Sequence, residues 1–177
     1  MKKDQEIFQE RLNHHHDELR WLYTELYHND DMFAELCDQM YQYFTARRRA
    51  LKNRDLEREK NPDWFRQKDM LGMMLYIDNF AGNIKGVSDK LPYLKECNVN
   101  CLHLMPFLDT PKGRSDGGYA VADFRKVRPD LGTMKDLAAL ADKCHKNGMN
   151  LCMDFVMNTL PRIMSGPEKH ARVTANI

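Results

Sequence analysis

The sequence lacks the features that mark membrane, secreted and metal-binding proteins. No apolar run approaches the roughly 18 residues that a membrane-spanning helix requires. The first ten residues, MKKDQEIFQE, have no apolar centre of the kind found in a signal peptide. The five cysteines form neither a CxxC pair nor a cysteine–histidine cluster with zinc spacing. We therefore expect reduced thiols in a cytoplasmic protein, with no membrane partner and no bound metal.

Two further absences narrow the class of function. The net charge is only +1 over 177 residues, and the locally basic segment 46–60 also contains acidic residues, as a solvated helix face does, so nucleic acid is not an expected partner. Neither a GxGxxG sequence after a strand nor a Walker A sequence occurs, and no cofactor is expected. Hydrophobic residues at 42% and charged residues at 30% are typical of a folded globular chain.

Residues 1–65 are predicted to form an all-helical domain. Apolar residues at spacings of three, four and seven give the first helix one amphipathic stripe, which the sequence HNDD at 28–31 interrupts. The stripe resumes on a second helix, and the two helices are expected to pack as an antiparallel hairpin. The stripe consists of Phe8, Leu12, Leu19, Leu22 and Leu26 on the first helix and Phe33, Leu36, Met40 and Tyr43 on the second.

The pattern then changes to alternating strands and helices. Continuous apolar runs predict three strands buried on both faces, at 70–77, 99–105 and 149–155. The order strand, helix, strand, helix, strand predicts parallel β/α units with right-handed crossovers. Periodicity leaves two architectures open, a doubly wound sheet and a TIM-type barrel.

The two intervening helices carry local signals of their own. Pro92 lies inside the first amphipathic segment and is expected to restart or kink that helix. Thr133 is a good N-cap for the second helix, with Asp136 three residues further on. Gly148 is a natural stop at its end.

The loop SDGGYAVADFR, residues 115–125, is the most informative stretch. In both parallel architectures, ligands bind at the carboxyl ends of the strands, where this loop belongs. Its adjacent glycines permit positive φ or a close approach of backbone to ligand. Asp116 can accept two hydrogen bonds from a diol, and Tyr119 offers an aromatic surface that suits the C–H face of a sugar ring. Taken alone, the loop is more typical of a tight turn with a packing tyrosine.

Four pieces of sequence carry a family resemblance. YIDNFAG, YLKECNVNCLHLMP, DGGYAVADFRKVRPDLGTMKDL and DFVMN occur in register across Met70–Asn158. They resemble the start of the catalytic barrel of glycoside hydrolase family 13, the α-amylase family, and in particular amylosucrase and related sucrose-cleaving enzymes. The resemblance implies an incomplete TIM (α/β)8 barrel, made of its first three β/α units over 66–158, preceded by the all-helical N-terminal domain.

The resemblance also implies a reaction and a sugar site. The family performs retaining double displacement on α-glucosides such as sucrose and α-glucans, with an aspartate nucleophile and a glutamic acid/base about 5 Å apart. Those acids follow later strands, so this chain is expected to have no catalytic acid and to be inactive alone. Tyr119 matches the family's stacking tyrosine, and Asp116 matches an aspartate of the same glucose subsite. Asp154 and Asn158 match the family motif Asp-x-x-x-Asn-His. In this motif Asp154 is expected to be structural and Asn158 to shape the loop. Asp78, after the first strand, is also expected to be structural.

Residues 159–177 depart from the family pattern. In the family, a histidine that binds a glucose hydroxyl follows the position of Asn158, and Thr159 stands there instead. One base inserted after the codon for Asn158 allows the following codons to read Asn-His-Thr-Ser-Glu-Asp-His-Glu-Trp-Ala, which is the family's continuation. We therefore expect 159–177 to be a frame-shifted, poorly ordered tail, a hypothesis that the coding DNA tests.

Three interpretations remain open at this point. The chain is the first part of an amylosucrase-like transferase or hydrolase, or a helical interaction module with a remnant half barrel, or a small open α/β domain of unrelated function. An exposed apolar stripe over 1–60 would favour the second. The residues present do not choose between polymerising, hydrolytic and phosphorolytic activity. In the barrel, six strand residues are expected to face the interior: Met73, Leu75, Leu102, Leu104, Leu151 and Met153.

Overall fold

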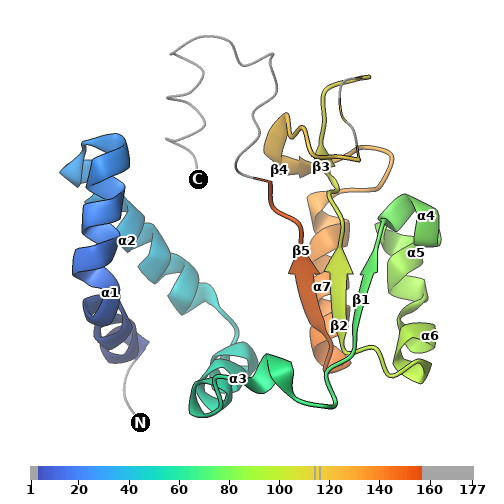
Figure 1. Cartoon of the computed structure of the whole chain (residues 1–177), viewed down its shortest axis with the longest axis horizontal. Helices are drawn as coiled ribbons and strands as arrows, with labels where there is room; N and C mark the ends of the chain where they lie inside the picture. Colours follow the sequence, from blue (N-terminus) through green and yellow to red (C-terminus); the bar gives the residue numbers. More distant parts are fainter. Residues whose placement is uncertain (1–3, 114, 116, 157–177) are drawn as a thin grey trace. The chain divides into compact units, whose positions relative to one another are not determined.

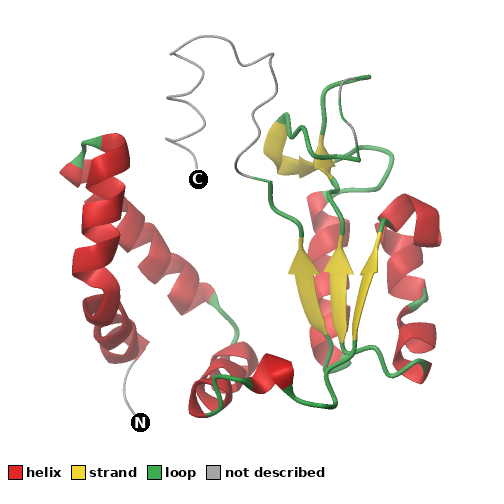
Figure 2. Ribbon diagram, viewed as in Figure 1, coloured by secondary structure: helices red, strands yellow, loops and turns green. Residues whose placement is uncertain are grey.

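A computed structural model describes residues 4–113, 115 and 117–156 of the 177-residue chain. The chain divides into two compact units, Met1–Phe65 and Arg66–Ile177 (Figure 1). The first unit is helical, and the second contains parallel strands with helices (Figure 2). Within the described part of the chain, no helix combines the length and the apolar character that crossing a bilayer requires.

The described part of the helical unit forms three helices over a segment predicted to be helical throughout, one more than the two that the apolar stripe delimited. Its helices are α1, Asp4–Tyr27, α2, Asp30–Ala46, and α3, Arg49–Lys60. Between α2 and α3 the backbone is extended at Arg47 (φ −62°, ψ 131°). The guanidinium of Arg47 donates two hydrogen bonds, of 2.7 and 3.0 Å, to the carboxylate of Asp55 on α3. This ion pair holds the turn that separates the two helices, and no hydrophobic periodicity encodes it.

Aromatic contacts confirm the antiparallel pairing of α1 and α2. Near the start of α1, the ring of Phe8 lies 5.2 Å from that of Tyr41 and 5.7 Å from that of Phe44, at the end of α2. Near the end of α1, Tyr23 lies 5.7 Å from Phe33 at the start of α2. The first helix therefore runs against the second in the opposite direction.

The predicted apolar stripe is only partly covered within this unit. Phe33 is buried, at 5% exposure, whereas Leu22 and Leu26 on α1 are 47% and 74% exposed. No described residue of α1 is fully buried. The hairpin is thus held mainly by aromatic contacts between α1 and α2, and part of its apolar surface stays open within the unit.

The second unit contains a parallel sheet and a smaller antiparallel pair. Strands β1, β2 and β5 lie side by side in the order β1-β2-β5, and both pairings are parallel (Figure 1). This order confirms the predicted parallel β/α units. The elements after α3 are the 3-10 turn η1, Trp64–Arg66; β1, Gly72–Leu75; α4, Ile77–Ala81; α5, Ile84–Asp89; α6, Leu91–Glu96; β2, Cys101–Leu104; β3, Leu108–Asp109; β4, Asp123–Val127; α7, Met134–Lys146; and β5, Asn150–Met153.

Local signals placed most helix boundaries correctly. Pro92 lies in the first turn of α6, where its missing N–H costs nothing, so it restarts the helix after α5. Thr133 caps α7: its hydroxyl accepts from the N–H of Asp136, and the carboxylate of Asp136 accepts from the N–H of Thr133 at 2.9 Å. The first strand is shorter than predicted because Ile77 already belongs to α4.

The connection between β2 and α7 holds a structure that the sequence analysis missed. Strands β3 and β4 pair antiparallel across it, with an irregular register. β3 has only two residues, and the burial of β4 does not alternate along its length. Neither strand therefore carries the period-two signal on which a strand prediction depends.

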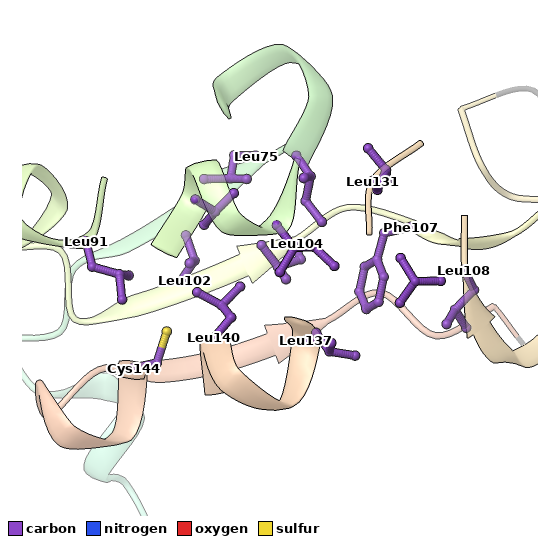
Figure 3. Close-up of a cluster of buried hydrophobic side chains, with 14 of the residues drawn as sticks. Leu75, Leu91, Leu102, Leu104, Phe107, Leu108, Leu131, Leu137, Leu140 and Cys144 are labelled. Carbon is purple, nitrogen blue, oxygen red and sulfur yellow. The ribbon is translucent and has the colours of Figure 1, made fainter. Parts of the chain in front are cut away.

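The predicted direction of the strand side chains is wrong. Leu75, Leu102 and Leu104 are buried in one cluster with residues of α5, α6 and α7, not turned toward the barrel interior. Figure 3 shows Leu102 and Leu104 on the same side as Leu140 and Cys144 of α7. Met73 and Leu151 pack against the same cluster, and Met153, on the outer strand β5, is 38% exposed.

The opposite face carries the alternate residues of the strands. Met74, His103 and Cys152 are paired across β1, β2 and β5 and share this face, because paired residues of parallel strands point the same way. Met74 is 62% exposed. Both faces were expected to be apolar, so the sequence did not reveal which face the helices cover; the structure assigns them to the leucine face.

The five cysteines are free, as expected. Cys144 of α7 is buried in the hydrophobic core, and this burial raises the pKa of its thiol to about 11. Cys97 and Cys152 are exposed instead, so the thiols are not uniformly core residues.

A pair of truncations tests which face of the sheet is packed. Leu104→Ala removes a fully buried side chain between the sheet and its helices, and we expect it to lower the free energy of unfolding by about 2–5 kcal/mol. Met74→Ala, on the opposite face, should lower it by much less. Urea denaturation followed by circular dichroism measures both. Equal losses for the two variants would contradict the assignment of the faces.

Candidate functional site

The candidate site lies where the parallel strands end. Tyr76 follows β1, Met105 follows β2 and Asp154 follows β5, so all three leave the sheet at its carboxyl edge. Backbone hydrogen bonds keep this edge in register: the N–H of Met105 donates to the carbonyl of Leu75, and that of Asp154 to the carbonyl of Leu104, both at 2.9 Å. This is the edge at which parallel α/β sheets bind ligands.

The double glycine brings its loop close to this edge. Gly118 is buried and has a φ of +88°, and a Cβ added there would lie 2.8 Å from the carbonyl oxygen of Pro106. Gly117 has a φ of +59°, and a Cβ there would lie 3.3 Å from the hydroxyl of Tyr76. Both the left-handed backbone and the close approach require glycine, as the sequence analysis anticipated.

Tyr119 and Asp154 lie near each other. The Asp154 carboxylate acts on the Tyr119 hydroxyl, so the glycine loop and the end of β5 meet here. Desolvation raises the pKa of Tyr119 above its usual value, and the nearby Asp154 carboxylate raises it further. The ring remains 41% exposed, so one aromatic surface is available to a ligand.

An ion-pair cluster fixes the segment after β1. Arg128 donates to the carboxylate of Asp78 at 2.7 Å and to that of Asp130 at 2.9 Å. The hydrogen bond from Arg128 lowers the pKa of Asp78, against the opposing effect of its partial burial. Asp78 therefore ties α4 to the segment after β4, which is a structural role.

Aromatic and apolar groups also occur near the carboxyl ends of β1 and β5. The ring of Phe155 lies 5.1 Å from that of Phe124 on β4. Beside β1, a hollow of about 400 Å³ is lined by six residues: Met74, Leu75, Tyr76, Asn79, Phe80 and Met105. The site thus combines aromatic surfaces with a hydroxyl–carboxylate pair, a combination that suits a ligand with apolar and hydroxylated parts.

The structure locates only some of the predicted site residues. Tyr119 and Asp154 lie near each other, whereas Asp78 is held by a different cluster. Asp116 and Asn158 lie outside the described residues, and so does the tail predicted over 159–177. Within 4–113, 115 and 117–156, no three acidic, histidine or cysteine side chains gather into a metal-binding group.

Two contributing residues were missed by the sequence analysis. Tyr76 lies next to the end of the run 70–77 that was predicted as the first strand, so its place near the carboxyl edge could have been recognised from the sequence. Arg128 lies 50 residues from Asp78 along the chain, and no sequence pattern connects the two.

The fold and the site define a parallel β/α protein, with its ligand edge at the carboxyl ends of the strands. Residues 58–165 match the family described as alpha amylase, catalytic domain. The chain therefore belongs to the α-amylase family, glycoside hydrolase family 13, and its second unit is an incomplete TIM barrel preceded by a helical region.

Relatives within the family act on different glucosides. The chain is 39% identical over 101 residues to a trehalose synthase/amylase of Mycolicibacterium smegmatis, covering 54% of this chain and 17% of the relative. It is 35% identical over 107 residues to an oligo-1,6-glucosidase of Saccharomyces cerevisiae, covering 56% of this chain and 18% of the relative.

The chain is also similar to a solved structure. This is a mutant of the isomaltulose synthase of Erwinia rhapontici in complex with its natural substrate sucrose, 28% identical with a TM-score of 0.46, and the match covers 51% of this chain and 17% of that one. The matched segment thus spans less than a fifth of each of these relatives. The α-amylase family is shown, and the predicted nearness to amylosucrase stays a prediction.

The Tyr119–Asp154 contact can be tested by titration. Replacing the carboxylate in Asp154→Asn removes the charge that repels a phenolate, so the pKa of Tyr119 should fall toward the usual value of about 10. Ultraviolet difference titration against Tyr119→Phe isolates this one hydroxyl. The pKa of Tyr119 is raised in the folded chain above its value in the unfolded chain. The group therefore contributes stability that is fully present below the unfolded-state pKa and is lost as the pH rises through the folded-state pKa.

Asp123→Asn is the matched control, because Asp123 is paired with Lys126 at 2.9 Å instead. It should leave the titration of Tyr119 unchanged. An unchanged Tyr119 titration in Asp154→Asn would show that Asp154 does not act on Tyr119.

Proposed function

We propose that this chain supplies the helical domain and the first three β/α units of an amylosucrase-like enzyme. The enzyme acts on sucrose or an α-glucan by retaining double displacement. We assign the helical domain to 1–65 and the barrel portion to 66–158. The observation that carries the proposal is the α-amylase match of residues 58–165, within which buried Gly118 brings the loop of Tyr119 against Pro106 at the carboxyl edge of the sheet.

The geometry supports a binding role for these residues. The exposed ring of Tyr119 is proposed to stack on the C–H face of a glucose ring, while Asp154 orients the tyrosine through its hydroxyl. Asp116, in the same loop, is proposed to accept hydrogen bonds from the sugar hydroxyls, and Asn158 to shape the loop beside them. The chain thus forms one wall of a glucose pocket.

The chemical step requires groups beyond this wall. Retaining hydrolysis needs a carboxylate that attacks the anomeric carbon and an acid that protonates the departing oxygen, with the two carboxyl groups about 5 Å apart. The resemblance assigns neither role to a residue of this sequence. The chain is therefore proposed to bind and orient the sugar and to be inactive by itself.

A second function, a helical interaction module with a remnant barrel, is favoured by one observation. Leu22 and Leu26 are exposed within the helical unit, as a partner-binding surface requires. A barrel portion without a catalytic role is not expected to retain a functional sugar-binding surface, so the experiment below separates the two proposals.

Segment replacement tests the sugar wall directly. In the Erwinia rhapontici isomaltulose synthase, the matching segment is replaced by residues 70–158 of this chain, and sucrose consumption is measured. We expect an active chimera in which Tyr119→Ala lowers kcat/KM about tenfold, equivalent to about 1.4 kcal/mol of lost transition-state binding. Tyr119→Phe keeps the ring and should retain most of the activity.

The unmodified chain by itself is the second arm and is expected to release no glucose from sucrose. Appreciable sucrose cleavage by this chain alone contradicts the proposal. So does a folded, active chimera that Tyr119→Ala leaves unaffected. An inactive chimera with native-like circular dichroism would favour the remnant barrel.

A further inference from the structure

A surface hollow on the helical unit surrounds an exposed tryptophan. It measures about 330 Å³ and is lined by Asp17, Arg20, Trp21, Thr24 and Asp30. The first four follow one another along α1 at helical spacing, which places them on one face of the helix. The Trp21 side chain is 61% exposed, so its ring is accessible from this hollow.

The polar rim of the hollow is held in place. Arg20 Nε donates to Asp30 Oδ1 at 3.1 Å, linking α1 to the first residue of α2. The hydroxyl of Thr24 donates to the carbonyl of Arg20 at 2.9 Å, which leaves its oxygen able to accept. The side-chain oxygen of Asn29 caps α2 by accepting from the N–H of Met32, fixing the backbone beside Asp30. These bonds fix Arg20, Thr24 and the start of α2, while the carboxylate of Asp17 contacts Nδ1 of His16 at 3.1 Å.

The charges of the rim select the kind of ligand. The hollow is lined by two carboxylates, Asp17 and Asp30, and by one guanidinium, that of Arg20, so its charges disfavour phosphates and other anions. An entirely apolar ligand would form no hydrogen bond with these carboxylates. The exposed carboxylates accept hydrogen bonds from hydroxyl groups, Arg20 donates them, and the indole offers a flat apolar surface. A neutral ring with one apolar face and a hydroxylated edge satisfies all of these groups.

We propose that this hollow is a second sugar-binding site, in which a glucose unit of an α-glucan stacks on Trp21. Asp17 and Asp30 accept hydrogen bonds from its hydroxyls. The site belongs wholly to the helical unit and shares no residue with the wall formed by Tyr119. Only the choice of an α-glucan rests on the proposed function. The site gives the helical domain a role in holding a chain-like substrate or product.

The chain contains two tryptophans, which makes the site directly observable. In the full chain, Trp64→Phe leaves Trp21 as the only indole fluorophore. We expect maltoheptaose to change this fluorescence saturably, and cellohexaose, the β-linked counterpart, to change it less. In calorimetric titrations of the full chain, Trp21→Ala should weaken maltoheptaose binding about tenfold or more, and Asp17→Ala and Asp30→Ala should each weaken it severalfold.

Two control variants separate this site from others. Tyr43→Ala removes another aromatic side chain of the same unit, 77% exposed and outside the hollow, and should leave binding unchanged. Tyr119→Ala, in the fluorescence assay, should also leave the Trp21 response unchanged. Circular dichroism confirms that each variant keeps its helices.

The outcomes distinguish the two proposals. No saturable change of Trp21 fluorescence with maltoheptaose overturns the second site, as does an equal response to cellohexaose. A response abolished by Tyr119→Ala places the sugar elsewhere and overturns it too. If the chimera fails the sucrose test while the Trp21 response persists, the second site stands and the proposed function falls.

Discussion

The packing of three helices against a single face of the parallel sheet is the constraint on which the second unit depends. Leu102 and Leu104 of the central strand are fully buried against these helices, together with Leu140 of α7. Burial of each such side chain contributes roughly 1.5–3 kcal/mol. Because this layer fixes the register of the strands, it also fixes where their carboxyl ends lie and which residues meet there. The Tyr119–Asp154 contact is a consequence of that layer.

The two faces of the sheet differ in what they require. The leucine face is covered by helices of the chain itself over β1 and β2, whereas Met153 on the outer strand β5 of this face stays 38% exposed. The other face, with Met74, His103 and Cys152, has mixed chemistry, and the Nε2 atom of His103 is buried without a hydrogen-bond partner among the described residues. In a closed barrel this second face is the interior, which is filled by side chains from all the strands.

Sequence patterns predicted the elements better than their contacts. The capping box at Thr133, the restart at Pro92 and the parallel order of the strands follow from local chemistry and periodicity, and all three are confirmed. The sequence did not reveal which face of the sheet the helices cover, because the predicted strands carry apolar residues on both faces. The pairing of Asp78 with Arg128 depends on tertiary proximity, which no single-sequence period encodes. In the Trp21 hollow, only Asp30 comes from outside α1, so helical spacing accounts for the rest. Tyr119 was predicted through family resemblance, whereas its proximity to Asp154 required the fold.

Hydrogen exchange of the backbone amides, measured by NMR on the full chain, tests the central claim most directly. Strand β2 pairs on both sides and is covered by helices on one face, so the amides of Leu102 and Leu104 should be among the slowest to exchange, together with those of α7. Amides near Gly113, in the loop after β3, should exchange much faster. Exchange of the β2 amides at the rate of that loop would mean that the sheet does not form a packed layer, and the account of the site built on its edge would be wrong.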